Sequence, residues 1–249
     1  MQLLHSFNDV TRVVPSVVAV GAFDGVHLGH QQLIRAVVNE AHAKGMQSAV
    51  VTFFPHPRVV LGRAPAKYLT LPEEKAKHIA ALGVDLMIVH EFTQETVHTP
   101  AAQFVAWMTD RLCMQSLWIG PDFALGYKRQ GNAAYLAEQG AQHGFAVNVM
   151  PEFSMDAQQI SSTRIREALA RGDVRAANLC LGRPFSVPAQ ADGQHGLCAS
   201  ELHWLPAPGD YPVLINGQAN RVTINDSPCA FELRDVLGGQ PREVTVEFV

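Results

Sequence analysis

Hydrophobic residues fall into short continuous runs that alternate with longer stretches of helical spacing through about the first 180 residues. Residues 17–20 and 48–53 are largely apolar runs, typical of strands buried on both faces of a parallel sheet. Between them, residues 31–43 place apolar side chains three and four positions apart, which predicts a helix. The same patterns predict further strands at 85–89, 116–119 and 145–149 and further helices at 72–82, 100–114 and 131–143.

Alternating strands and helices predict the fold class α/β, with an open parallel Rossmann-like sheet that carries helices on both faces. The pattern changes after about residue 185. Residues 188–196 are rich in Pro, Gly, Ala and Gln and predict a linker, and Asn216-Gly217 predicts a two-residue hairpin. We therefore predict two domains, 1–186 and a small antiparallel β domain at 187–249. Its β-patterned runs lie near 197–205, 211–215, 219–224, 230–236 and 243–249.

The composition excludes several classes of protein. With 47% hydrophobic and 17% charged residues, the chain is not disordered. A net charge of −4 excludes a broad basic surface, so we predict no nucleic-acid partner. No run approaches the roughly 18 uncharged apolar residues of a membrane span, so no membrane partner is predicted either. Four cysteines without a C-x-x-C pair are expected to be reduced core residues of a cytoplasmic protein.

A glycine-rich turn, GAFDGVHLGH, follows the first predicted strand at residues 21–30 and opens the first predicted helix. Ligands of open α/β sheets bind at the carboxyl ends of strands, and a helix start offers free N–H groups to a phosphate. His27 and His30 are three positions apart, so both imidazoles can face one point at the helix start. Two such donors would stabilise a phosphate that gains charge in its transition state. The alternative is a glycine turn with two surface histidines.

A second candidate phosphate site lies at residues 159–166, where hydroxyls at 161–163 and arginines at 164 and 166 open another helix. Ser161 or Ser162 is explained equally well as an N-cap. The arginines are not, because the helix dipole disfavours cations at this end. A bound polyanion that the arginines clamp accounts for them better.

Four segments in one order resemble a known family: GAFDGVHLGH at 21–30, TFFPHP at 52–57, GPDFALGYKRQG at 120–131 and ISSTRIREALARGDVRAANLCLGRPF at 160–185. Together they are similar to the adenylyltransferase module of the bacterial bifunctional riboflavin kinase/FMN adenylyltransferase (FAD synthetase) family. The resemblance covers roughly residues 15–185. It implies a nucleotidyltransferase domain at 1–186.

The resemblance also implies roles for individual residues. His27, His30 and Arg164 would be catalytic. The ATP side would comprise Gly21, Phe23, Asp24, Gly25, Asp122, Ile160, Ser161, Ser162, Thr163 and Arg166, although other members often carry Asn where this chain has Asp122. The flavin side would comprise Phe54, Pro55, His56, Pro57, Phe123 and Arg129. Taken singly, these residues have simpler explanations: a rigid Pro-His-Pro turn, core phenylalanines and an exposed Lys128-Arg129 pair.

The activity that the resemblance implies joins ATP and FMN. The terminal phosphate of FMN would attack the α-phosphorus of ATP and give FAD and pyrophosphate. Mg²⁺ would accompany ATP and be held largely by phosphate and water, so no residue is predicted as a metal ligand.

One part of the family pattern is missing. The bifunctional enzymes continue after this motif with a riboflavin kinase barrel that contains a PTAN segment, but this chain has only about 64 residues after Gly182-Arg-Pro-Phe185 and no PTAN. We therefore predict an FMN adenylyltransferase without riboflavin kinase activity, in which 187–249 is a degenerate remnant of that barrel. The alternatives are a regulatory flavin- or nucleotide-binding pseudoenzyme and an adenylyltransferase for another phosphorylated acceptor.

Overall fold

The computed structural model describes residues 1–155, 158–191, 196–225, 231–233 and 242–249. The chain divides into two compact units, and each is described by itself. The first unit comprises residues 1–66 and 72–159, and the second comprises 67–71 and 160–249.

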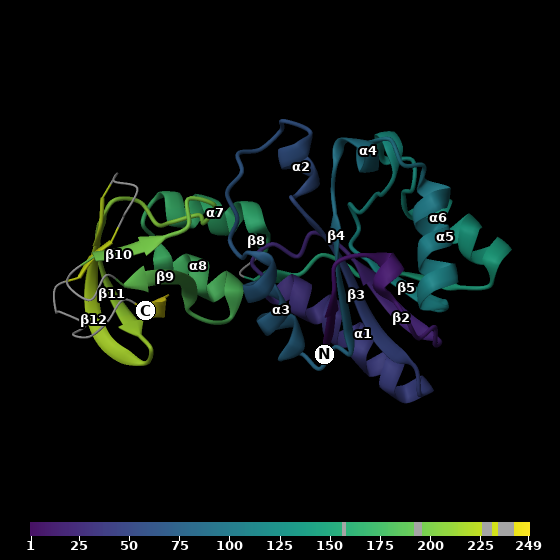
Figure 1. The fold of residues 1–249 in the computed structure, drawn as a ribbon, viewed down its shortest axis with the longest axis horizontal. Helices are drawn as coiled ribbons and strands as arrows, with labels where there is room; N and C mark the ends of the chain where they lie inside the picture. Colours follow the sequence, from purple (N-terminus) through teal and green to yellow (C-terminus); the bar gives the residue numbers. More distant parts are fainter. Residues whose placement is uncertain (156–157, 192–195, 226–230, 234–241) are drawn as a thin grey trace. The chain divides into compact units, whose positions relative to one another are not determined.

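The first unit is built on a sheet whose strand order is β1-β4-β3-β2-β5-β6, with every neighbouring pair parallel (Figure 1). The strands are β1 Gln2–Leu4, β2 Ser16–Val20, β3 Gln47–Phe54, β4 Leu86–Glu91, β5 Met114–Ile119 and β6 Ala146–Val149. The helices are η1 Phe7–Asp9, α1 Leu28–Lys44, α2 Pro57–Val60, α3 Pro72–Ala80, α4 Gln94–Val97, α5 Ala101–Leu112, η2 Tyr127–Arg129 and α6 Ala133–His143, and a small hairpin pairs β7 Ser154–Met155 with β8 Gln158–Gln159. All predicted strands and helices of this region are present. The elements that were not predicted are β1, η1, α2, α4, η2, β7 and β8, all of which are too short to leave a periodic pattern.

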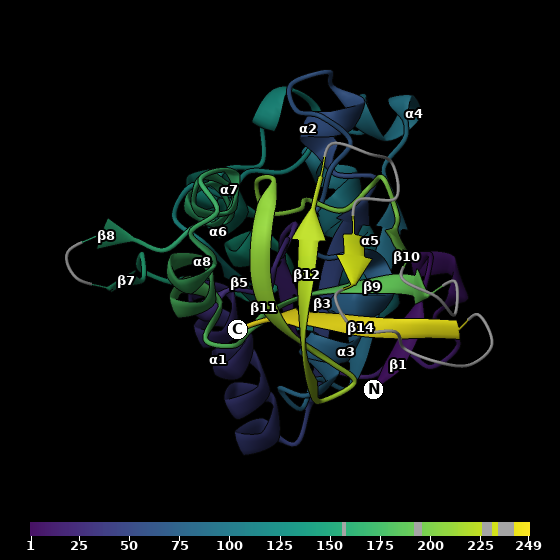
Figure 2. The ribbon, with the colours of Figure 1, turned by 90° about the vertical axis from the view of Figure 1, so that its left-hand side faces the viewer.

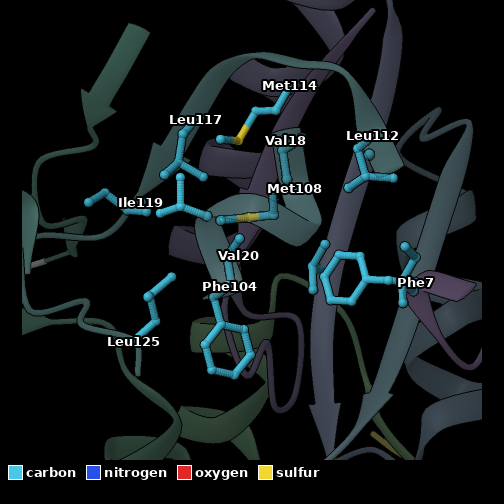
Figure 3. Close-up of a cluster of buried hydrophobic side chains, with 14 of the residues drawn as sticks. Phe7, Val18, Val20, Phe104, Met108, Leu112, Met114, Leu117, Ile119 and Leu125 are labelled. Atoms are coloured by element: carbon cyan, nitrogen blue, oxygen red, sulfur yellow. The ribbon is translucent and has the colours of Figure 1, made fainter. Parts of the chain in front are cut away.

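Helices cover both faces of the sheet, as predicted. Val18 and Val20 of β2 point to one face, where they pack with apolar side chains of α5 (Figure 3). Leu136 of α6 belongs to the same cluster. Val17 and Ala19 point to the other face and pack with α1 and α3. Successive strand residues alternate between faces, so an uninterrupted apolar run fills both clusters.

The strand order reverses direction at the carboxyl end of β2. β2 pairs with β3 on one side and with β5 on the other. α1 joins β2 to β3 across one face, whereas α5 leads into β5 across the opposite face. Loops that leave neighbouring strands in opposite directions create the position at which α/β sheets bind ligands. The loops here begin at Gly21 and Gly120, and each opens one of the four motifs.

The second unit contains a closed antiparallel barrel with the order β10-β13-β12-β11-β14-β9, several strands of which face the viewer in Figure 2. Its elements are α7 Ser162–Ala170, α8 Val174–Leu181, β9 Phe185–Ala191, β10 Gly196–Ala199, β11 Gly209–Ile215, β12 Gln218–Ile224, β13 Phe231–Leu233 and β14 Arg242–Phe248. The predicted hairpin is present, with Asn216 at φ 50° and Gly217 at φ 81° between β11 and β12. The small antiparallel β domain is thereby confirmed.

The predicted linker at 188–196 is wrong for residues 188–191, which belong to β9, and for Gly196, which begins β10; residues 192–195 lie outside the described ranges. Val187, Ala189 and Ala191 are buried at every second position, whereas Gln190 is exposed. This alternation is typical of a strand. It was not recognised in the sequence because the alternating positions include small residues and Pro188.

The two units divide between residues 159 and 160, earlier than the predicted boundary between 186 and 187. Asn178 explains why α8 belongs with the barrel. Its side chain donates to the carbonyl of Phe248 at 2.9 Å and accepts from the N–H of Phe185 at 2.7 Å. The segment 67–71 joins the same unit, because the backbone of Tyr68 pairs with residues 202–204.

The cysteines differ from one another. Cys113 and Cys180 are free thiols, as expected. The expectation of reduced cysteines is wrong for Cys198, which is disulfide-bonded. A bond between distant positions leaves no local spacing signature, so the absence of C-x-x-C did not exclude it. Cys229 lies outside the described residues. No helix in the described ranges combines the length and apolar character that crossing a bilayer requires.

Candidate functional site

The turn between β2 and α1 folds tightly over a buried ring. Phe23 and Gly25 adopt left-handed φ values of 48° and 82°. The Phe23 ring lies directly beneath Gly21, where an added Cβ would come within 2.9 Å of it. Phe23 is therefore a core residue that supports the turn, and Asp24 beside it is also buried. The buried Phe23 ring thus fixes the conformation of the turn.

His27 and His30 form a stacked pair at the start of α1. His27 is the N-cap, and its Nδ1 accepts the backbone N–H of His30 at 3.3 Å. The two rings lie 3.5 Å apart with an interplanar angle of 18°. The side chain of His27 is only 6% exposed, which excludes a surface position for this residue. The structure therefore brings the two predicted imidazoles to one point.

The surroundings of His30 disfavour a second positive charge. Its Nδ1 is buried and has no hydrogen-bond partner among the described residues. Burial first, then the neighbouring His27 and then Lys75 hold the pKa of His30 well below its usual 6.5. The ring is therefore neutral near pH 7 and available as a hydrogen-bond donor or acceptor.

Lys75 is a residue of this site that the sequence analysis missed. It lies on α3 with its side chain buried, and its Nζ donates to the carbonyl of Ala22 at 2.6 Å and to Oγ1 of Thr52 at 3.3 Å. Burial lowers the pKa of Lys75 to about 8, and the charge of Asp24 acts in the opposite direction. One signal was present in the sequence, because Lys75 occupies the core-facing position four residues before Ile79.

The loop after β5 contains the third motif. The N–H of Phe123 donates to the carbonyl of Gly120 at 3.2 Å, and Nη2 of Arg129 donates to the carbonyl of Asp122 at 2.7 Å. Lys128 and Arg129 both adopt left-handed φ values, of 51° and 58°. Both are exposed, as the simple explanation of this pair expected, yet the loop folds them back toward a cavity.

This cavity of about 360 Å³ lies within the first unit. Five of its lining residues are aromatic: Phe53, Phe92, Phe104, Phe123 and Tyr127. Four are cationic: Arg58, Arg63, Lys128 and Arg129. An apolar pocket with a few convergent charges suits a flat organic molecule that carries an anionic group.

The predicted flavin-side residues reach this cavity in part. Pro57, Phe123 and Arg129 line it. Phe54 packs instead against the apolar cluster on the face of the sheet that α1 covers. His56 is the N-cap of α2, where its Nδ1 accepts the N–H of Arg58 at 3.0 Å.

Arg58, Arg63 and Phe92 also line the cavity but were not predicted. Arg58 follows the Pro-His-Pro turn directly, so its place beside a predicted loop was the available signal. Phe92 follows β4, whose neighbour in the sheet is β3.

Residues of the fourth motif lie in the second unit. Ser161 is the N-cap of α7, and its Oγ accepts the N–H of Arg164 at 3.2 Å. The simpler explanation of this serine is therefore confirmed. Arg164 and Arg166 are half-buried in the first turn and a half of the helix, and the Arg166 guanidinium lies 6.0 Å from the centre of the Trp204 ring. Ile160, just before the helix, is buried. Ser162 is half-buried and Thr163 is exposed.

The described residues contain no group of three or more His, Cys, Asp or Glu side chains that could hold a metal ion. Asp24 is buried beside a lysine and Asp122 is exposed, so these two carboxylates are not part of such a group. The described part of the chain thus provides no carboxylate cage for Mg²⁺.

Comparison with known proteins identifies close sequence relatives. Residues 11–164 match the sequence profile described as FAD synthetase. The chain is 40% identical over 175 residues to the bifunctional riboflavin kinase/FMN adenylyltransferase of Listeria monocytogenes, a match that covers 70% of this chain and 55% of the relative. It is 37% identical over 191 residues to the Haemophilus influenzae protein of the same name, covering 75% and 62%. The chain thus matches little more than half the length of these relatives.

One solved structure has the same fold. A crystal structure of a protein called a macrolide-efflux protein, from Streptococcus pneumoniae, superposes with a TM-score of 0.85 and covers 99% of this chain and 88% of the other. The two sequences are 23% identical, so the similarity establishes the fold alone.

Proposed function

The chain belongs to the FAD synthetase family, and from this premise we propose that it is an FMN adenylyltransferase, which transfers AMP from ATP to FMN. The observation that carries the proposal is the stacked pair of His27 and His30 at the start of α1. The pair follows the carboxyl end of β2, which pairs with β3 on one side and β5 on the other, and open α/β sheets bind ligands at such positions.

In the proposed reaction, an oxygen of the FMN phosphate attacks the α-phosphorus of ATP. A new phosphorus–oxygen bond forms, the bond to the β-phosphate bridging oxygen breaks, and pyrophosphate leaves with that electron pair. No covalent enzyme intermediate is needed, so the protein's work is positioning and charge stabilisation. His27, His30 and the first N–H groups of α1 supply hydrogen-bond donors to the phosphate oxygens.

The cavity of the first unit is the proposed FMN site. Its aromatic walls suit a planar ring system, and its four cations suit the phosphate of FMN. Phe123 and Arg129 belong to the same loop, so one segment contacts both parts of the ligand in this proposal. Arg58 and Arg63 extend the proposed phosphate contacts beyond the residues that the motifs indicated.

The fourth motif offers a separate set of candidates for phosphate binding, which carry a permanent positive charge. Arg164 and Arg166 are placed at the start of α7, and arginine binds phosphate through two parallel hydrogen bonds. We propose that this pair holds the triphosphate. The backbone N–H groups of Ser162 and Thr163 at the same helix start would add to it.

Mg²⁺ is proposed to enter with ATP. The described residues do not fit a protein-built Mg²⁺ site, since no cluster of carboxylates is present among them. A Mg²⁺ ion that binds phosphate oxygens and water does not require one.

Conversion of FMN to FAD in a purified preparation tests the proposal directly. The protein is incubated with ATP and Mg²⁺ and with either FMN or riboflavin, and products are separated by chromatography. We expect FAD from FMN and no FMN from riboflavin, since the PTAN segment of the family's kinase does not occur in the sequence. The His27→Ala variant should be silent under the same conditions.

Other outcomes point to the alternatives. Binding of FMN or FAD without turnover would favour a regulatory pseudoenzyme. Turnover with a different phosphate monoester and none with FMN would identify an adenylyltransferase with another acceptor. FMN formation from riboflavin would contradict the proposed absence of kinase activity.

A further inference from the structure

Lys75 is a buried ammonium group that the proposed chemistry does not use. Its side chain is 4% exposed, and its neighbours Ala76 and Ile79 belong to an apolar cluster. An ammonium group is costly to bury unless nearby groups compensate its charge. Two questions therefore arise: which groups compensate the charge of Lys75, and what the charge does there.

The partners of Lys75 lie in the nucleotide-binding turn and the adjacent strand. Nζ donates to the carbonyl of Ala22 at 2.6 Å and to Oγ1 of Thr52 at 3.3 Å. The Thr52 hydroxyl also donates to the carbonyl of Ala22 at 3.0 Å. The buried carboxylate of Asp24 supplies the opposite charge. Three elements therefore meet at one backbone carbonyl: α3, β3 and the turn.

The same ammonium group acts on the histidine pair through its charge. The groups that act on the charge of His30 are His27, stacked on it at the start of α1, and Lys75, from α3. Asp24, in the turn, acts in turn on Lys75. Both His27 and Lys75 oppose protonation of His30. Lys75 thus places a positive charge near the histidine pair.

We propose that Lys75 is a positioning residue for adenylyl transfer, whose buried ammonium fixes the Ala22 carbonyl and thereby the turn that presents α1 and both histidines to the nucleotide. The inference rests on the proposed function, because it assigns ATP to this turn. Its ligand class is a nucleoside triphosphate, and Lys75 acts on that ligand through the turn and through its charge.

Three substitutions separate the hydrogen bond from the charge. Lys75→Gln keeps a donor for the Ala22 carbonyl and removes the charge. Lys75→Met removes both, and Lys75→Arg keeps both. Lys77→Met is the matched control, since Lys77 lies exposed on the same helix. Thermal melts of all four variants establish that they are folded.

Two measurements are made on each folded variant. The first is the dissociation constant for Mg²⁺–ATP by calorimetry, together with kcat and KM for FAD formation. The second is the NMR titration of the His30 Cε1 proton without nucleotide, which does not depend on activity. We expect kcat/KM for ATP to fall by about 100-fold in Lys75→Met, as misplacement of a site by about 1 Å does in other enzymes. Lys75→Gln should lose less than Lys75→Met, and Lys75→Arg least.

The His30 titration midpoint should move upward in Lys75→Gln and Lys75→Met, because one repelling cation is gone. It should stay at the wild-type value in Lys75→Arg and Lys77→Met. If Lys75→Met does not fold, the Gln and Arg variants still test the charge.

Lower melting temperatures with unchanged ATP affinity and an unchanged His30 titration in Lys75→Gln would overturn the inference and leave Lys75 a purely structural residue. A wild-type protein that forms no FAD would instead contradict the proposed function. In that case ATP affinity and the His30 titration still decide the role of Lys75.

Discussion

The N-termini of α1 and α7 both leave backbone N–H groups free to bind phosphate, but they carry different side chains. α1 is capped by the buried imidazole of His27 and carries the half-buried imidazole of His30 in its first turn. α7 is capped by the hydroxyl of Ser161 and carries Arg164 in its first turn. The first helix start presents His30, whose pKa burial holds well below its usual value, and the second presents a charge that no accessible pH removes.

This difference suggests a division of labour between the two helix starts. Guanidinium groups attract a triphosphate in its ground state and in the transition state alike, which chiefly improves binding. Neutral donors with fixed geometry matter most where charge develops on the reacting phosphorus, which chiefly improves the rate. Substitutions at the two helix starts should therefore separate kcat from KM.

The largest effect is expected at the histidine pair. His30→Ala removes a preorganised donor and should lower kcat for FAD formation by about 10²- to 10³-fold. KM for ATP should change much less, because the cations of α7 remain. Steady-state kinetics with varied ATP measure both constants. A variant with wild-type kcat and a raised KM would place His30 in binding and break the proposed division.

Arg164 should show the opposite signature. Hydrogen bonds to charged groups contribute about 1.5–3 kcal/mol, so Arg164→Gln should raise KM for ATP by about tenfold to a hundredfold. Arg164→Lys, which keeps the charge but loses the planar fork, should recover part of this loss. Equal losses of kcat in Arg164→Gln and His30→Ala would contradict separate roles of the two helix starts in binding and rate.

Acid should destabilise the first helix start and leave the second unaffected. The pKa of His30 is lower in the folded protein than its usual 6.5, so the unfolded chain takes up a proton first as the pH falls. The free energy of unfolding should therefore decline below about pH 6.5, by at most about 1.4 kcal/mol per pH unit for this one group.

Urea unfolding at a series of pH values, compared between wild type and His30→Gln, measures this contribution. The variant should show a shallower decline. Identical pH dependence in the two proteins would contradict the burial of a neutral imidazole.

The smallest effect is expected at the cap of α7. Ser161→Ala removes the acceptor for the N–H of Arg164 and should cost about 1 kcal/mol of stability. Thr163→Ala, at an exposed position of the same helix, is the control and should cost less. Thermal melts compare the two. A larger loss of ATP affinity than of stability in Ser161→Ala would give the hydroxyl a role in binding as well.

Local pattern predicted much of the fold, and long-range pairing explains what it missed. The strand and helix around GAFDGVHLGH follow from apolar spacing and a glycine turn, which are local properties. The strand at 185–191 was hidden because its pairing with β14 is what makes it a strand. Cys198 was misassigned because cysteine spacing alone does not show which thiols form disulfides.

The site was predictable where motifs carried it and less so where packing did. The stacking of His27 on His30 agrees with their spacing of three. Lys75 was not predicted, because a single charged residue on an apolar helix face gives no functional signal until its buried partners are known. Arg63, which lines the cavity, was not predicted because a loop residue has no periodic pattern.

The closure of the barrel has a consequence for how copies of this protein meet one another. A strand at the margin of a sheet offers unpaired backbone groups that recruit strands from other molecules. In the barrel, β9 pairs with both β14 and β10, so the ring of strands has no such margin. The sheet of the first unit ends instead at β1 and β6, whose three and four residues offer little length for recruitment. Both units thus limit intermolecular strand addition, one by closure and the other by brevity.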